Sequence, residues 1–196
     1  MTRDYRSTDD PYCHPGSGVL RNKAGATDQA ALDALEKHLT SIRFEEPLPE
    51  GLLDTGHYRA MHRHLFQDVF DWAGEYRTVR IAKGGSMFCY PEYINAEMER
   101  IFAALRKNIL AKLLSRRDFA SGAAQFLAEL NAVRPFREGN GRAQLAFLTV
   151  LTEEAGHPLD LEHFHPERLL AAMITSYKTG DTNLLEAEIL ARKGGI

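Results

Sequence analysis

The stretch NAVRPFREGNGRAQ, residues 131–144, joins two segments whose apolar residues recur at helical spacing. Its centre places an acid, a Gly-Asn-Gly turn and an arginine at consecutive positions, 138–142. Glycines let the backbone N–H groups of a turn approach a ligand closely, and the start of a helix adds unpaired N–H groups and a positive dipole end. The pattern therefore predicts an anion site, suited to phosphate, where the second helix begins.

Each residue of this turn has a chemical role in that interpretation. Gly139 and Gly141 would bring backbone N–H groups to a phosphate, while Asn140 tolerates a left-handed conformation and offers an amide. Arg142 can reach a second phosphate with its forked guanidinium. Glu138 would repel phosphates unless Mg²⁺ lay between them, so we expect it to bind that metal. The alternative is a helix end, a glycine turn and a helix start with surface arginines, and a lone Gly-x-Gly would favour that simpler interpretation.

Helical periodicity covers most of the remaining chain. Residues 76–90, YRTVRIAKGGSMFCY, alternate instead and contain Gly84-Gly85, which favours a β-hairpin. Residues 1–26 are rich in Asp, Pro, Gly and Ser and are expected to form an irregular arm over the surface. The expected helices cover about 27–44, 56–71, 91–114, 115–133, 141–155 and 166–178, with a last one capped by Asp181. The sequence thus predicts one mainly α domain, residues 1–196, built as a helical bundle with one small hairpin.

Composition narrows the class of protein. The 196 residues suit one domain with a substantial core, and a net charge of -3 without a basic stripe argues against direct nucleic-acid binding. The N-terminus is polar, unlike a secretion leader, and no apolar run is long enough to cross a membrane. We therefore expect a cytoplasmic protein. Cys13 and Cys89 are expected to be free thiols in a reducing compartment, with a disulfide between them as the alternative.

The central motif resembles the signature of the Fic family, His-x-Phe-x-(Asp/Glu)-Gly-Asn-Gly-Arg-x-x-Arg. These enzymes transfer AMP from ATP to hydroxyl side chains of target proteins. The stretches DPYCHPGSGVLRNKAG (10–25) and FQDVFDWAGEYRTVRI (66–81) resemble the N-terminal and pre-flap segments of short bacterial Fic toxins. The resemblance covers nearly the whole chain in the right order, and the chain is identified as a member of this family with a Fic fold.

The resemblance assigns roles to particular positions. Glu138 would hold Mg²⁺ between the α- and β-phosphates of ATP, and Arg142 would contact the β-phosphate. The anion hole would be formed by Gly139, Asn140 and Gly141. The hairpin would be the flap that docks an extended segment of the target by strand addition. The flap positions implied in docking are Ala82, Lys83, Gly84 and Phe88, of which Lys83 and Gly84 are also candidates for contacting the nucleotide.

Two positions depart from the family signature. Arg134 stands where the family has the histidine that takes the proton from the attacking hydroxyl, and an arginine stays protonated and has no free lone pair. Loss of a general base costs about 10²–10⁴-fold in rate, so we expect nucleotide binding with little or no transfer. Leu145 stands where the family usually has an arginine that engages the γ-phosphate. We expect this leucine either to weaken the orientation of ATP or to make the site less dependent on a γ-phosphate contact. A replacement base is not expected from His62 or His64, which fall on opposite faces of one helix.

These departures leave alternatives open. Arg134 is either an inactivating change on an intact toxin scaffold or the mark of a natural pseudoenzyme that binds nucleotide or an antitoxin. A third possibility is a relative that uses another phosphate donor. The chain has no inhibitory motif of the type (Ser/Thr)-x-x-x-Glu-(Gly/Asn), so the resemblance implies a separate small antitoxin that carries it. The implied target class is the ATPase subunits of type II topoisomerases.

Overall fold

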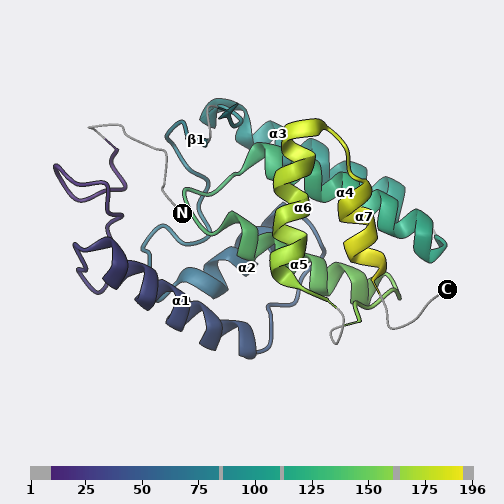
Figure 1. Ribbon diagram of the computed structural model, residues 1–196, viewed down its shortest axis with the longest axis horizontal. Coiled ribbons are helices and arrows are strands. Elements are labelled where there is room, and N and C mark those ends of the chain that lie inside the picture. The colour runs from purple at the N-terminus through teal and green to yellow at the C-terminus, as the bar shows by residue number, and fades with distance from the viewer. Residues whose placement is uncertain (1–9, 84–85, 111–112, 161–163, 192–196) are drawn as a thin grey trace.

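The computed structural model describes residues 10–83, 86–110, 113–160 and 164–191, and these form a helical bundle with one two-stranded sheet (Figure 1). This confirms the predicted mainly α architecture. The elements are α1 (Gln29–Glu45), α2 (Thr55–Phe66), β1 (Ala82–Lys83), β2 (Ser86–Met87), α3 (Pro91–Leu105), a π-helical turn (Arg106–Leu110), α4 (Arg116–Val133), α5 (Asn140–Glu154), α6 (Pro166–Thr179) and α7 (Asn183–Leu190).

Helix α5 is the centre of the bundle, as its nearly continuous apolar sequence predicts. It packs against α2 on one side and α4 on the other, and α1 covers α2 while α6 and α7 cover α4. Figure 1 shows this order from the purple N-terminal helix to the yellow C-terminal pair. Phe147 of α5 is fully buried and meets Tyr58 edge to face, with ring centroids 5.5 Å apart. The start of α5 is therefore held on a rigid aromatic core.

Several element boundaries differ from the predicted ones. Helix α2 ends at Phe66 rather than near residue 71, because the N–H groups of Val69 and Phe70 both turn back to the Phe66 carbonyl. Helix α3 ends at Leu105 and is followed by a π-helical turn, whereas the sequence predicted one helix to about residue 114. Residues 111–112, shortly before that predicted end, lie outside the described ranges.

The predicted strand length of the hairpin and the predicted N-cap of the last helix also need correction. The hairpin strands are two residues long each, far shorter than the alternating stretch 76–90, because the segment before them is held by the Arg77 side chain rather than by a ladder. Thr182, not Asp181, occupies the N-cap position of α7. The Asp181 carboxylate still accepts a hydrogen bond of 2.8 Å from the Asn183 N–H, so it satisfies the first helical donor.

The described part of the N-terminal arm, residues 10–26, contains no helix, but it is not confined to the surface. Cys13 and Leu20 form an isolated antiparallel bridge, and both are buried in the core together with Val19. The apolar residues between the turn residues explain this burial, because removing them from water is favourable. Cys13 and Cys89 are both free thiols, as expected. Across the described ranges, no helix combines the length and the apolar character needed to span a membrane.

Candidate active site

The motif turn is fixed by two left-handed backbone positions. Arg134 ends α4 with φ 45°, and Gly139 precedes α5 with φ 80°. A Cβ atom on Gly139 would lie 2.3 Å from Cζ of Phe66, so no other residue fits without moving that ring. The left-handed conformation and the close ring both require glycine here. Sequence reasoning assigned this glycine to ligand approach, and the structure adds a packing reason.

Asn140 braces the turn from within. Its Oδ1 accepts a hydrogen bond of 3.0 Å from the Phe136 N–H, and its Nδ2 donates to the Phe136 carbonyl at 2.8 Å. The side-chain amide is therefore engaged inside the loop rather than offered to a ligand as the sequence suggested. The N–H groups of Asn140, Gly141 and Arg142 precede the first intrahelical bond, which runs from Ala143 N to Gly139 O at 3.0 Å. These N–H groups are the anion-binding donors of a helix start.

His62 supports the turn from α2. Its Nδ1 accepts from the Gly74 N–H at 2.9 Å, so its Nε2 carries the proton and donates to the Glu138 carbonyl at 2.9 Å. The ring stacks on Phe136 with centroids 3.8 Å apart and is fully buried. Burial lowers the pKa of His62 to about 3, so the imidazole is neutral at working pH. Both ring nitrogens are occupied, which makes His62 a structural support for the loop rather than a base.

His64 points elsewhere. Its Nε2 donates to the Arg43 carbonyl at 2.8 Å, on the side of α2 that faces α1. The two histidines thus occupy different faces of the helix, in agreement with their spacing.

Arg142 is held by three groups from the first two helices. Its Nη2 donates to Oε1 of Glu36 and its Nη1 to Oγ1 of Thr40 at 3.2 Å, both on α1. Its guanidinium also lies over the ring of Phe66 at 4.6 Å. Sequence reasoning missed Glu36 and Thr40, because no local pattern announces a contact between residues about a hundred positions apart.

A second arginine of the motif has a buried partner of its own. Arg137, between Phe136 and Glu138, donates from Nε and Nη2 to Oδ2 of Asp10 at 3.0 and 2.7 Å. Both side chains are almost completely buried. The arm is thereby fastened to the motif turn.

Arg134 occupies the position that the family resemblance assigns to the signature histidine. Its guanidinium stands 4.8 Å from the centre of the Phe88 ring, so it reaches the base of the flap. Burial lowers the pKa of Arg134 below its ordinary value. The Nε atom is buried and has no hydrogen-bond partner among the described residues. The structure thus places a half-buried cation between the turn and the flap.

The flap is an antiparallel pair in which Ala82 faces Met87 and Lys83 faces Ser86. Gly84, predicted to contact nucleotide and target, lies outside the described residues. Tyr177 of α6 holds the second strand, because its hydroxyl donates to the Met87 carbonyl at 3.0 Å. Its ring packs against Phe88 with centroids 5.0 Å apart.

Arg77 joins the flap to the motif turn. Its guanidinium, 2% exposed, donates to four carbonyl oxygens at 2.6–3.1 Å. These belong to Val79, Cys89, Val133 and Arg134. Burial lowers the pKa of Arg77 to about 10, so it still carries its charge at neutral pH.

Glu138 is the carboxylate of the motif turn that could hold a metal ion. The carboxylate is half-buried next to the start of α5, and its Oε1 accepts from the Gly139 N–H at 3.0 Å. The described ranges contain no group of three or more His, Cys, Asp or Glu side chains arranged to hold a metal by themselves. Mg²⁺ is commonly bound by one or two carboxylates together with substrate phosphates and water. A single acid beside a phosphate site therefore fits Mg²⁺ bound with a nucleotide.

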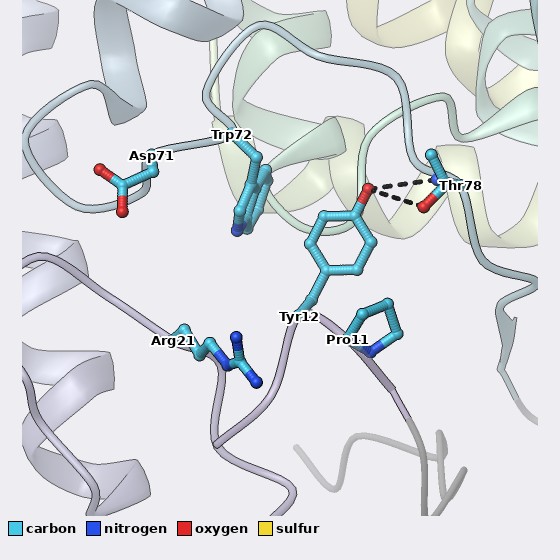
Figure 2. Close-up of a pocket in the computed structure, with 6 residues that line it drawn as sticks. All are labelled: Pro11, Tyr12, Arg21, Asp71, Trp72 and Thr78. Carbon is cyan, nitrogen blue, oxygen red and sulfur yellow. Dashed lines mark hydrogen bonds between the residues drawn. The ribbon is translucent and has the colours of Figure 1, made fainter. Parts of the chain in front are cut away.

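A separate hollow lies where the arm meets the segment after α2, and Figure 2 shows its walls. It is lined by Pro11, Tyr12, Arg21, Asp71, Trp72 and Thr78, none of which belongs to the motif or the flap strands. The Tyr12 ring meets the indole of Trp72 edge to face, and the Tyr12 hydroxyl accepts from the Thr78 N–H at 3.1 Å (Figure 2). These contacts hold the arm in place beside Asp10.

Comparison with known proteins identifies the class to which this fold and site belong. A model of the Fic/DOC family matches residues 52–152. The chain is 53% identical over 186 residues to the probable protein adenylyltransferase y4lH of Sinorhizobium fredii, covering 94% of this chain and 96% of that protein. It is 35% identical over 190 residues to the protein adenylyltransferase VbhT of Bartonella schoenbuchensis, covering 95% of this chain but 40% of VbhT.

Solved structures agree. The BepC protein of Bartonella tribocorum with bound AMPPNP superposes with a TM-score of 0.80 at 27% identity, over 91% of this chain and 93% of that one. An N-terminal Fic domain from Bartonella quintana with bound ADP gives 0.79 at 28% identity, over 91% and 92%. The chain belongs to the Fic/DOC family, which confirms the family expected from the motif.

Proposed function

We propose that this chain is a Fic-type protein adenylyltransferase scaffold whose transfer step is disabled by Arg134. ATP with Mg²⁺ would be the donor, a Tyr, Thr or Ser hydroxyl of a target protein the acceptor, and pyrophosphate the leaving group. The observation that carries this proposal is the braced turn at the start of α5, where the N–H groups of Asn140, Gly141 and Arg142 precede the first intrahelical bond and the Arg142 side chain is held by α1. Relatives named protein adenylyltransferases, and two similar structures with bound nucleotides, support the donor.

The motif turn would bind ATP and its metal ion. Glu138 would hold Mg²⁺, which neutralises phosphate charge when bound. The N–H groups at the start of α5 would bind phosphate oxygens, and Arg142 would contact the β-phosphate, stabilising the charge that grows on the leaving pyrophosphate. Each of these groups is positioned before a ligand arrives, because Asn140, His62 and Glu36 hold the turn and Arg142.

The acceptor would dock on the free edge of the flap. Phe88 N donates to Ile81 O at 3.2 Å, so the next pair, Ala82 and Met87, directs its N–H and C=O groups outward. The Met87 carbonyl is already engaged by Tyr177, which leaves the Ala82 edge for an added strand. Phe88 continues the other strand of the hairpin and packs against Arg134, so the flap that would dock the target adjoins the position of Arg134.

Arg134 would stop the reaction at the proton transfer. The acceptor hydroxyl must lose a proton as it attacks the α-phosphate, and a protonated guanidinium cannot accept one. The stacked, half-buried position of Arg134 also fills space beside the flap. The contact between Arg134 and Phe88 also favours a second candidate function. In it the chain is a pseudoenzyme that binds nucleotide and a partner but transfers no AMP.

The partners remain those implied by the family resemblance. A small antitoxin carrying the inhibitory motif would regulate the chain, and a type II topoisomerase ATPase subunit in the cytoplasm would be the target. A Fic relative with a different phosphate donor is separated from this proposal by screening radiolabelled donors other than ATP.

The deciding experiment compares the chain with its Arg134→His variant. Each is incubated with α-labelled ATP, Mg²⁺ and a bacterial lysate free of antitoxin. We expect the variant to label a discrete protein at least about 10²-fold faster, because a general base contributes that much or more. Adding Glu138→Gln to the variant should remove the labelling. If neither protein labels anything although both bind ATP, the loss is deeper than one base and the pseudoenzyme function is favoured; Leu145→Arg is then the next change to test.

A further inference from the structure

Two buried carboxylates from the N-terminal part of the chain hold the two arginines that flank the motif turn. Asp10 pairs with Arg137, and Glu36 pairs with Arg142. Both acids precede residue 52, where the family match begins. The turn that would bind the donor is therefore completed by a segment that lies outside the matched family core.

The Glu36 contact differs from the Asp10 contact in what its arginine can still do. Arg137 is sealed in the interior, with 8% of its side chain exposed. The Arg142 side chain keeps 34% of its surface exposed, whereas Glu36 behind it keeps 5%. Arg137 can serve only the fold, but Arg142 faces outward from a buried anchor.

The hydrogen-bonding capacity of Arg142 is not exhausted by its anchor. A guanidinium has five N–H donors. Glu36 and Thr40 each accept one of those bonds, and the Phe66 ring fixes the plane of the group. Thr40 is itself fixed, since its hydroxyl donates to the Glu36 carbonyl at 2.7 Å. Arg142 therefore has donors left for a phosphate while its orientation is already set.

We propose that Glu36, assisted by Thr40, is a positioning residue that presents Arg142 to the β-phosphate of the nucleotide. The inference rests on the proposed function, because it assumes that Arg142 contacts that phosphate. Fixing a long side chain in advance spares its immobilisation when the ligand binds, which strengthens binding. Glu36 thus acts on nucleotide affinity through Arg142 and never touches the nucleotide.

The test measures binding of AMP, ADP and ATP by calorimetry with Mg²⁺, and needs no transfer activity. For Glu36→Ala we expect Kd to rise about tenfold for ADP and ATP, the size of effect expected from freeing one long side chain. AMP has no β-phosphate, so its Kd should stay within about twofold. Glu36→Gln keeps an oxygen acceptor and should recover much of the loss.

Two control variants separate positioning from general damage. Asp10→Asn weakens the other buried ion pair of the same turn, and any effect it has should fall equally on all three nucleotides. Glu45→Gln changes an exposed acid of α1 and should change none of them. Thermal unfolding of each variant checks that it is folded. If Glu36→Ala does not fold, Glu36→Gln and Thr40→Val carry the same test with smaller expected losses.

The outcomes are distinct. A loss confined to ADP and ATP supports the inference. An equal loss for all three nucleotides, no loss, or tighter ATP binding overturns it and leaves the proposed function standing; tighter binding would show that Glu36 competes with phosphate for Arg142. If the unaltered chain binds none of the three nucleotides, the proposed function fails and the inference fails with it.

Discussion

The motif turn and the flap lie side by side in this protein but are held in different ways. The turn is braced by hydrogen bonds from Asn140 and His62 and by a stacked aromatic core. The flap has two residues in each strand, and its second strand is held from outside by Tyr177. In the proposed function, the region that binds the nucleotide is thus formed before a ligand arrives, whereas the region that docks the target depends on a few contacts near the surface.

The difference suits the two substrates. A nucleotide is small and always the same, so a rigid site binds it with little loss of entropy. A protein segment that adds to a strand edge brings its own backbone hydrogen bonds, so the edge needs only to be presented. Arg77 connects the two regions, since its guanidinium binds carbonyls of both, in addition to the contact of Arg134 with Phe88.

The largest effect on stability is expected from removing the Arg77 guanidinium. Arg77→Met would leave four carbonyl oxygens, one buried and three partly buried, without this donor. We expect the free energy of unfolding to fall by about 3–5 kcal/mol, as for other losses of a buried charged hydrogen-bonding group. Urea denaturation measures this, with Arg77→Lys as a control that keeps the charge and part of the bonding. A loss below about 1 kcal/mol for Arg77→Met would mean that the two regions are joined by other contacts.

The rigidity of the turn predicts a pH dependence. The pKa of His62 is lowered from 6.5 to about 3 by burial, so the folded state holds the neutral ring while the unfolded state takes up a proton below pH 6.5. Stability is therefore complete above pH 6.5 and is lost progressively as pH falls toward 3. The His62 contribution to this loss is about 2 kcal/mol between pH 7.5 and pH 5.

Urea denaturation at several pH values, compared with the His62→Gln variant, isolates this contribution. The variant is expected to be less stable at pH 7.5 but to lose about 2 kcal/mol less on acidification. Equal losses in both proteins would show that His62 can be protonated without opening the turn, contrary to its two hydrogen bonds.

The smallest effect on stability is expected from changing Tyr177, whose hydroxyl holds the second strand of the flap. Tyr177→Phe removes the hydrogen bond to the Met87 carbonyl but keeps the ring packed on Phe88. Stability should change by less than about 1 kcal/mol, because the bond is exposed. In the Arg134→His background, KM for the target should rise about twofold to threefold while KM for ATP is unchanged. A rise in KM for ATP instead would show that a change in the flap also alters the motif turn, so that the two regions are not held independently.

The fold was largely readable from the sequence because its signals are local. Helical spacing located helices that the structure contains, and their starts carry local signals: Asp28 caps α1 and Pro91 begins α3. The hairpin was located but its strands were overestimated, because alternation in 76–81 reflects anchoring by Arg77 rather than pairing. Helix ends at 66 and 105 were missed because no proline or glycine marks them.

What the sequence alone determined is the chemistry of the turn: an acid, two glycines and an arginine at a helix start, within reach of one another by their spacing. The tertiary structure decided which groups hold that chemistry in place. Glu36 and His62 come from helices about a hundred and about seventy-five residues before their partners in the turn, and only the packing of α1 and α2 brings them there. A buried hydrogen bond between distant residues leaves no periodic trace in a sequence, because its two ends are selected by the fold rather than by their neighbours in the chain.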